Sequence, residues 1–345
     1  MNQQQYISET KKKFDLKRIE TLLKKIKNIN ILVIGDTIID EYVFVTPKGR
    51  AIKDPILSVE YINQESYAGG VLAVVNHLST FVNNIQLVTV IGDKESKIDF
   101  INNSVDSNVS VKAFVKDDSP TTIKRRYVDA YKNNKLFKIE VINDKPISEK
   151  LSDEIVGYLL SEIEKYDLVF VADFGHGFIN NEIRRVLEQE SKFLSINVQS
   201  NSANMGFNYV NLYKKVDFLT MNDTEIRLPL MMRFEPIEEV ITEFHKRFGH
   251  NKFLLTLGKK GSVLYNGDKL TYSPVLIDKV VDTVGAGDAL FAISSLFTYL
   301  NVDDEIVPFV ANCAGGIKAN YLGNKESVTK ERLIKFIESL YQNVE

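Results

Sequence analysis

The chain has 345 residues, of which 44% are hydrophobic and 26% are charged. Its 43 Lys and Arg nearly balance its 46 Asp and Glu, and the net charge of −3 excludes the domain-wide basic field typical of nucleic-acid binding. A single cysteine excludes an internal disulfide, and with four scattered histidines it shows no metal-ligand spacing. These properties predict a globular protein, with one large domain or two modest ones, that acts on a small molecule.

The amino-terminal segment is polar where a signal peptide would be apolar, and no apolar run approaches the roughly 18–20 residues of a membrane-spanning helix. We therefore expect a cytoplasmic protein without a membrane partner. Residues 8–28 place apolar side chains at roughly helical spacing among lysines. This pattern predicts an amphipathic helix docked on the domain, so that residues 1–28 form a helical extension. A membrane-surface helix, the alternative, would need a broader apolar face.

Short apolar, β-branched runs alternate with helical patterns along the chain. The first run, residues 31–34, is followed by Gly35-Asp36, which we expect to end a buried strand. Similar runs occur at residues 87–91, 168–171, 193–196, 218–220 and 253–257, and helical patterns at 149–163, 179–190 and 236–248. The alternation predicts an α/β fold with a mostly parallel sheet covered by helices on both faces. Ligands of such sheets bind at the carboxyl ends of the strands.

Two segments interrupt this alternation. Residues 42–62 and 121–141 alternate apolar and polar positions and contain no helical pattern between their halves. They predict strand pairs that form a small antiparallel sheet outside the main one, which we call the lid. Because an outlying sheet with an apolar face must cover a ligand cleft or a second subunit, we expect a homodimer joined through the lid.

The most informative segment is DTVGAGDAL, residues 282–290, which precedes an apolar helical pattern. A Gly285-Ala286-Gly287 turn that leads into a helix leaves backbone N–H groups unpaired at the positive end of the helix dipole. Such a site suits a phosphoryl group. Asp288, in the first helical turn, could accept a proton from a substrate hydroxyl beside that anion. The structural alternative is a tight turn with Asp288 as a helix cap.

DTVGAGDAL also resembles the carboxyl-terminal signature of the ribokinase-like (PfkB) sugar kinases. Further landmarks follow in that family's order: GDTIID at 35–40, Ala68-Gly69-Gly70, NDTE at 222–225 and TLGKKG at 256–261. The resemblance covers about residues 28–342. It implies a ribokinase-like three-layer α/β/α sandwich, with a kinase domain at 29–345 that carries the lid and transfers the γ-phosphoryl group of ATP to a sugar hydroxyl.

Within the family, the chain is most similar to kinases that phosphorylate D-glycero-D-manno-heptose 7-phosphate at the anomeric hydroxyl. The similar stretches are ILVIGDTIIDEY at 31–42, PTTIKRR at 120–126, VADFGHGFI at 171–179 and ANCAGGIKANYLG at 311–323. Such kinases are often fused to a nucleotidyltransferase domain. Since no His-x-Gly-His nucleotide-binding signature occurs here, we expect any second activity to come from another protein.

The resemblance also implies roles for individual residues. Asp288 would be the catalytic base, and the amides of Gly285, Ala286 and Gly287 would hold the transferring phosphoryl group. The ATP side would consist of Asn222, Glu225, Thr256, Gly258, Gly261 and Asn312. Glu225 would organise Mg²⁺ through water, which suits an ion that retains several waters, and Asp282 would stand beside a monovalent cation such as K⁺.

On the acceptor side, the resemblance implies that Asp40, Gly69 and Gly70 contact the sugar. Lys124 and Arg126 match basic positions of the heptose kinases and would face the 7-phosphate. Their alternative is a pair of ordinary solvated charges on an edge strand.

The acceptor site departs from the family pattern at two places. Ala73 stands where the family has a sugar-contacting Asn, and Asn76, about one helical turn further on, is the candidate replacement. Residues 196–204 replace the Asp-Pro-Lys run of the heptose kinases with a polar amide cluster. The acceptor therefore stays open between a heptose 7-phosphate-like sugar, another carbohydrate and a nucleoside. A binding protein without turnover is an alternative of another class. A dinucleotide-binding dehydrogenase is disfavoured, since no Gly-x-Gly-x-x-Gly follows the first strand.

Overall fold

The computed structural model describes residues 3–344, and its centre is a large, mostly parallel sheet. The strands of this main sheet, in spatial order, are β12 (Lys269–Ser273), β11 (Ser262–Asn266), β10 (Lys252–Thr256), β9 (Phe218–Asn222), β8 (Leu194–Val198), β7 (Leu168–Asp173), β1 (Ile31–Arg50), β3 (Ile85–Lys94) and β4 (Val109–Pro120). Neighbours from β10 to β4 pair in parallel, and β11 and β12 continue the sheet as antiparallel strands. All the strands expected from the apolar runs are present. The sequence did not predict β4, β11 or β12.

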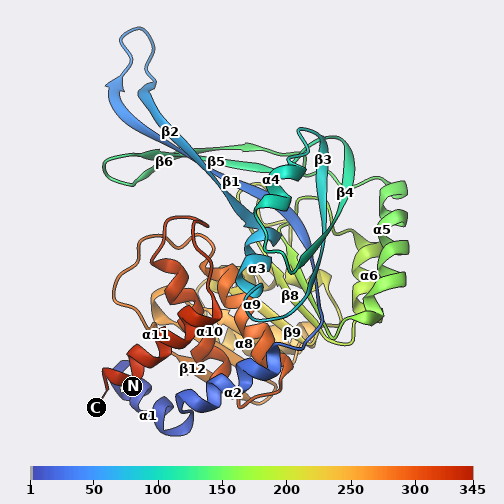
Figure 1. The fold of residues 1–345 in the computed structure, drawn as a ribbon, viewed down its shortest axis with the longest axis vertical. Helices are drawn as coiled ribbons and strands as arrows, with labels where there is room; N and C mark the ends of the chain where they lie inside the picture. The colour runs from blue at the N-terminus through green and yellow to red at the C-terminus, as the bar shows by residue number, and fades with distance from the viewer. Residues whose placement is uncertain (1–2, 345) are drawn as a thin grey trace.

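Helices cover both faces of this sheet (Figure 1). One face carries α3 (Val71–Leu78), α9 (Ala286–Tyr299), α10 (Ile306–Ala319) and α11 (Lys330–Gln342), and the other carries α5 (Glu149–Glu162), α6 (Asn181–Glu190) and α8 (Ile237–Phe248). Alternate residues of β1 enter the two cores: Ile31 and Val33 lie in one, Leu32 and Ile34 in the other. The expected three-layer α/β/α sandwich is confirmed.

Apart from those of the amino-terminal segment, the remaining helices are short. They are α4 (Ile98–Asn103) and α7 (Asp223–Arg227), with one-turn 3₁₀ segments at Ile163–Lys165, Val210–Leu212, Leu228–Leu230 and Gly258–Lys260. Within residues 3–344, no helix combines the length and the apolar character needed to cross a bilayer.

The expectation that the first strand ends at Gly35-Asp36 is wrong, because β1 continues to Arg50. Its first part pairs in parallel with β3 and β7, and from Thr37 onward it pairs antiparallel with β2 (Leu57–Gly70). A Cβ atom at Gly35 would collide with the carbonyl oxygen of Ala172 on β7. Glycine is therefore required here for the close approach of two strands and not for a turn.

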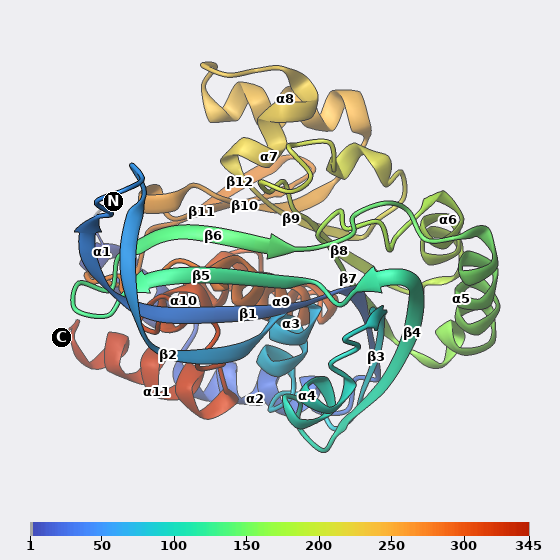
Figure 2. The ribbon, with the colours of Figure 1, turned by 90° about the horizontal axis from the view of Figure 1, so that it is seen from above.

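The lid consists of β2, the outer part of β1, β5 (Ile123–Asp129) and β6 (Lys135–Val141). Figure 2, which views the molecule from the lid side, shows these four strands side by side in front of the body of the molecule. The predicted strand pairs at 42–62 and 121–141 are confirmed, but the lid is not purely antiparallel, because β1 and β5 pair in parallel. Since β1 belongs to both sheets, it carries the lid directly above the carboxyl ends of the main strands.

The described part of the amino-terminal segment forms two helices, so the prediction of one helix over 8–28 is wrong. They are α1 (Gln3–Lys13) and α2 (Leu16–Ile26). The break occurs at Asp15, whose carboxylate accepts the N–H of Arg18 at 2.8 Å and caps α2. Phe14 is buried, and its carbonyl accepts the Tyr341 hydroxyl of α11 at 2.7 Å. These helices share the core beneath α9 to α11, which makes them part of the domain and not an appendage.

Candidate active site

A cleft of about 680 Å³ lies between the lid and the carboxyl ends of the main strands. Its walls include the ends of β9 and β10, the amino terminus of α9, one side of α10 and parts of β1 and β5. This is the location that the strand order predicts for a ligand. Most of the residues that the sequence singled out line this cleft.

The amino terminus of α9 points its first backbone amides toward the cleft. Gly285 precedes the helix with φ of +79°, a left-handed conformation, and a Cβ atom there would collide with the Asn324 side chain. The N–H of Ala286 donates to the Thr283 carbonyl at 3.2 Å, whereas those of Gly285 and Gly287 have no protein acceptor within the described chain. Two of the three amides expected to hold an anion are thus unpaired, at the positive end of the helix dipole.

Asp288 is buried beside these amides. Gln199 donates its side-chain N–H to the Asp288 carboxylate at 2.9 Å. Burial, reinforced by the negative charge of Asp40, raises the pKa of Asp288 to about 6. A carboxylate with this pKa is a stronger base than a solvated one. Gln199 belongs to the amide-rich run 196–204, for which the sequence did not predict a binding partner within the protein.

Asn222 and Glu225 form a capping box at the start of α7. Asn222 accepts the Glu225 N–H at 2.9 Å, and the Glu225 carboxylate accepts the N–H groups of Asn222 at 2.8 Å and Ser200 at 3.1 Å. Burial raises the pKa of Glu225 to about 7. Both carboxylate oxygens are already engaged, and residues 3–344 contain no group of three or more His, Cys, Asp or Glu arranged for a metal ion. The residues therefore fit a Mg²⁺ ion that is held by substrate phosphates and reaches Glu225 through water.

The remaining residues predicted for the nucleotide line one end of the cleft: Thr256, Gly258, Gly261 and Asn312. Gly258 has φ of +57°, and a Cβ atom at Gly261 would collide with the Ser273 carbonyl. Asn312, on α10, donates to the carbonyls of Ser273 and Pro274, both at 2.9 Å. Its amide therefore fixes the loop after β12 as a wall of the cleft.

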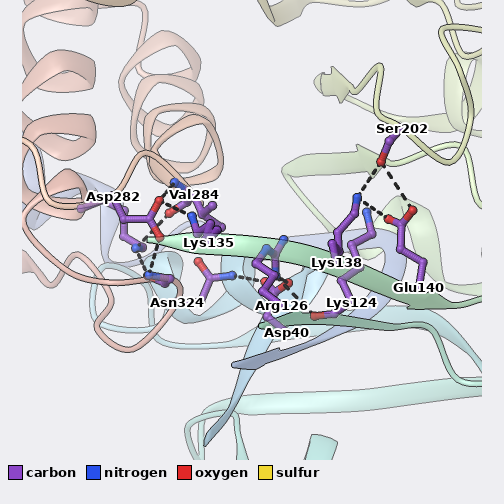
Figure 3. A network of polar contacts seen from close by, with 12 residues as sticks. Asp40, Lys124, Arg126, Lys135, Lys138, Glu140, Ser202, Asp282, Val284 and Asn324 are labelled. Carbon is purple, nitrogen blue, oxygen red and sulfur yellow. Dashed lines mark hydrogen bonds and ion pairs between the residues drawn. The ribbon is translucent and has the colours of Figure 1, made fainter. Parts of the chain in front are cut away.

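The end of the cleft where the sequence predicts the acceptor is rich in charge. Asp40 is 3% exposed; one carboxylate oxygen forms an ion pair with Arg126, and the other accepts the Asn324 amide at 2.8 Å. Figure 3 shows this group with Lys124 beside it. Lys124 is 7% exposed, and its ammonium lies 5.7 Å from the Phe174 ring centroid. Lys124 and Arg126 are therefore not ordinary solvated charges on an edge strand.

Of the two glycines and the amide expected at the sugar, only Gly70 lines the cleft. Gly69 is not part of the lining; it packs so closely against Asp40 that a Cβ atom would lie 2.5 Å from the carboxylate oxygen. The prediction for Asn76 is wrong: its amide donates to the Ser104 carbonyl at 2.8 Å, on the side of α3 that faces α4. Gly70 immediately precedes α3, so the cleft meets only the amino-terminal end of this helix.

Asp282 lies behind the α9 amides that the sequence predicts to bind an anion, and it joins three segments. Its carboxylate accepts the N–H groups of Val284 at 3.2 Å and Gly323 at 3.0 Å, and the Lys135 ammonium of the lid at 2.7 Å (Figure 3). Lys318 donates to the carbonyls of the same two residues, Val284 and Gly323. With two ammonium groups here, the surroundings of Asp282 do not fit an additional monovalent cation.

Sequence reasoning missed Lys318, Asn324 and Lys135. Lys318 had one available signal: it is the only charged residue within the apolar helix α10. Asn324 and Lys135 lie in loop and lid positions whose contacts arise only from the tertiary fold.

The family model described as pfkB family carbohydrate kinase matches residues 28–314. The chain belongs to this family. Its members are phosphotransferases that act on sugar hydroxyls, and the chain is therefore such an enzyme.

Individual relatives are distant. The bifunctional protein HldE of Aliarcobacter butzleri (strain RM4018) is 25% identical over 324 residues, which cover 92% of this chain and 66% of that protein. The structure of Arabidopsis thaliana ribokinase complexed with ribose and ATP has a TM-score of 0.68 and 19% identity, covering 90% of this chain and 99% of the ribokinase. Phosphofructokinase-2 from Escherichia coli in complex with potassium also has a TM-score of 0.68, at 13% identity, covering 91% and 99%. These two structures support the fold alone.

Proposed function

We propose that the enzyme is an ATP- and Mg²⁺-dependent kinase whose acceptor is a sugar phosphate similar to D-glycero-D-manno-heptose 7-phosphate. The observation that carries the proposal is the convergence on one cleft of the Asp288 carboxylate, the free amides of α9, the buried Lys124 and the partly buried Arg126. The similarity to a protein named HldE supports the choice of acceptor.

The reaction would proceed in one displacement. The acceptor hydroxyl oxygen attacks the γ-phosphorus of ATP, and its proton passes to the Asp288 carboxylate. The bond from the γ-phosphorus to the β,γ-bridging oxygen breaks, and ADP leaves. The N–H groups of Gly285 and Gly287 stabilise the charge on the transferring phosphoryl oxygens. Mg²⁺, when bound, would neutralise phosphate charge, with Glu225 holding its water.

Acceptor recognition would be divided between two kinds of contact. Asp40, oriented by Arg126 and Asn324, would accept hydrogen bonds from sugar hydroxyls. The Lys124 ammonium, largely removed from water, would pair with the acceptor phosphate. The lid above the cleft would exclude water, to which the phosphoryl group would otherwise transfer.

The test is an acceptor panel with ADP release as the readout. Heptose 7-phosphate, hexose 6-phosphates, unphosphorylated sugars and nucleosides are offered at equal concentrations with Mg·ATP. We expect turnover with sugar phosphates above all others. Preference for a nucleoside or an unphosphorylated sugar would contradict the proposed acceptor. Binding by calorimetry without ADP release for every acceptor would instead support the alternative of a binding protein without turnover.

We also propose a homodimer joined through the lid. The hairpin between β1 and β2 exposes a group of large apolar side chains: Ile52, Ile56, Leu57, Tyr61 and Ile62. A patch of this kind is typical of an interaction surface. Light scattering should give the mass of a dimer, and Ile62→Glu should give a monomer. A wild-type monomer at assay concentrations would contradict the proposal.

A further inference from the structure

Two peptide segments behind the anion-binding amides are each held by the same pair of side chains. Val284 and Gly323 both donate their N–H groups to the Asp282 carboxylate. The carbonyls of the same two residues both accept hydrogen bonds from the Lys318 ammonium. The carboxylate thus binds the N–H groups of these two residues, and the ammonium binds their carbonyls. This arrangement clamps the loop before α9 to the loop after α10.

Lys318 is set deep in this clamp. It is 1% exposed, and its ammonium lies at a helix end among the carboxylates of Asp282, Asp288 and Asp40. Burial lowers the pKa of Lys318, and those three carboxylates oppose the change. A buried ammonium with two carbonyl acceptors and nearby carboxylates makes the contacts that a bound metal cation would otherwise make.

The clamp acts directly on the anion-binding site. The Val284 carbonyl and the Gly285 N–H belong to the same planar trans peptide, so they point in opposite directions. When Lys318 holds the carbonyl at 3.1 Å, it therefore aims the Gly285 N–H away from itself. A Cβ atom at Gly285 would lie 3.0 Å from the Lys318 side chain, which shows how closely the two residues pack.

We propose that the Lys318 ammonium replaces a monovalent cation behind the anion-binding amides, so that this enzyme needs neither K⁺ nor Na⁺. Lys318 is a positioning residue: it acts on the phosphoryl group through the Val284–Gly285 peptide. The inference rests on the proposed phosphoryl transfer for its kinetic consequence, but its cation-binding consequence can be measured without any acceptor. An added metal ion would compete with Lys318 for the two carbonyls. It would also be repelled by the positive charge of the ammonium.

The first experiment uses the wild-type protein. Thermal unfolding and ADP release are measured in KCl, NaCl, CsCl and N-methylglucamine chloride at equal ionic strength. We expect the same midpoint and the same rate in all four salts. A selective rise of either quantity in KCl would overturn the proposal, and the unfolding arm gives this result even if the acceptor has been misassigned.

The second experiment removes the Lys318 ammonium by substitution. Lys318→Ala removes the ammonium and leaves room for an ion, and it should lower the rate in N-methylglucamine by about 10²-fold, the usual cost of a misplaced oxyanion donor. KCl should restore part of that rate and raise the unfolding midpoint, since a ligand that binds only the native state stabilises it. Lys318→Met fills the space without charge, and no salt should rescue it.

The chain offers a matched control. Lys116 is also buried, and its ammonium also bridges two backbone carbonyls, those of Asn143 at 2.6 Å and Lys145 at 2.5 Å, away from α9. Lys116→Ala should show no selective rescue by KCl. The proposal is contradicted if KCl rescues Lys318→Met, or if it rescues Lys116→Ala as well as it rescues Lys318→Ala. It is also contradicted if folded Lys318→Ala shows no response to KCl. If Lys318→Ala does not fold, the wild-type salt series still decides.

Discussion

The two ends of the cleft are built in different ways. The phosphoryl end consists of backbone amides and glycines, held from behind by the buried pair Asp282 and Lys318. The acceptor end consists of charged side chains, Asp40, Lys124 and Arg126, which reach the cleft from two strands of the lid. Backbone geometry can serve any acceptor, whereas charged side chains select one. Substitutions at the first end should therefore affect the rate with every acceptor, and those at the second should affect the choice of acceptor.

The largest effect is expected at Asp288. Asp288→Asn preserves the shape and the Gln199 contact but cannot accept the hydroxyl proton, and loss of a general base lowers the rate by roughly 10²–10⁴-fold. Stopped or steady-state assays of ADP release should show this loss with every acceptor, while calorimetry should show ATP binding close to that of the wild type.

The control for this variant is Asp278→Asn, which neutralises an exposed carboxylate on the loop before the motif. It should leave the rate unchanged. Near-normal turnover by Asp288→Asn would show that Asp288 is not the general base. It would also contradict the difference in function proposed for the two ends of the cleft.

The next largest effect is expected at Gly285. Gly285→Ala introduces a Cβ atom that would collide with Asn324 at a residue with φ of +79°, so the peptide must rotate. Misplacing one donor of an oxyanion site costs about 10²–10³-fold in rate. Gly287→Ala is the matched comparison, because its Cβ would meet nothing within 4 Å. Its rate should fall much less, and equal losses in the two variants would show that backbone orientation is not what matters.

The same contrast explains how far the sequence could predict the site. The phosphoryl end is encoded within residues 282–288, where a Gly-Ala-Gly turn leads into a helix, so local physics indicated an anion site. It left a helix-cap role for Asp288 open, and the catalytic role was implied by the family resemblance. Lys318 and Gln199 were not recognised as partners of that end, because their contacts depend on how α10 and the loop after β8 pack. Asn76 was misplaced because a helical turn of separation in sequence does not determine which side of α3 faces the cleft.

The fold shows a parallel limit. Alternating apolar runs predicted the parallel strands, but the continuation of β1 into the lid was missed, since Gly35 signals a close approach to β7 as readily as a turn. The break between α1 and α2 was missed for a similar reason: the helical spacing of apolar residues continues across Asp15, and only its capping contact reveals the new start.

A smaller and more selective effect is expected at Lys124. Lys124→Gln removes a buried charge from the acceptor end, and loss of a charge-assisted hydrogen bond should lower kcat/KM for a sugar phosphate by about 10–100-fold. The KM for ATP and turnover of the corresponding unphosphorylated sugar should change little. Lys138→Gln is the control, because Lys138 is exposed and already bound to Glu140. An equal loss with phosphorylated and unphosphorylated acceptors would contradict a role in phosphate recognition.

The smallest effect expected is a shift in pH dependence that couples the two ends. Burial and the Asp40 charge raise the pKa of Asp288 from 3.8 to about 6, and only the ionised carboxylate can accept a proton. Activity should therefore fall as the pH decreases through about 6, well above the range of an ordinary aspartate. Asp40→Asn removes the neighbouring negative charge, which lowers the pKa of Asp288 and moves this acid limb to lower pH. Lys124→Gln removes a positive charge and moves it to higher pH. Profiles of kcat/KM against pH give the position of the acid limb independently of the lower overall rates. An acid limb at the same pH in Asp40→Asn as in the wild type would show that the two ends do not interact electrostatically.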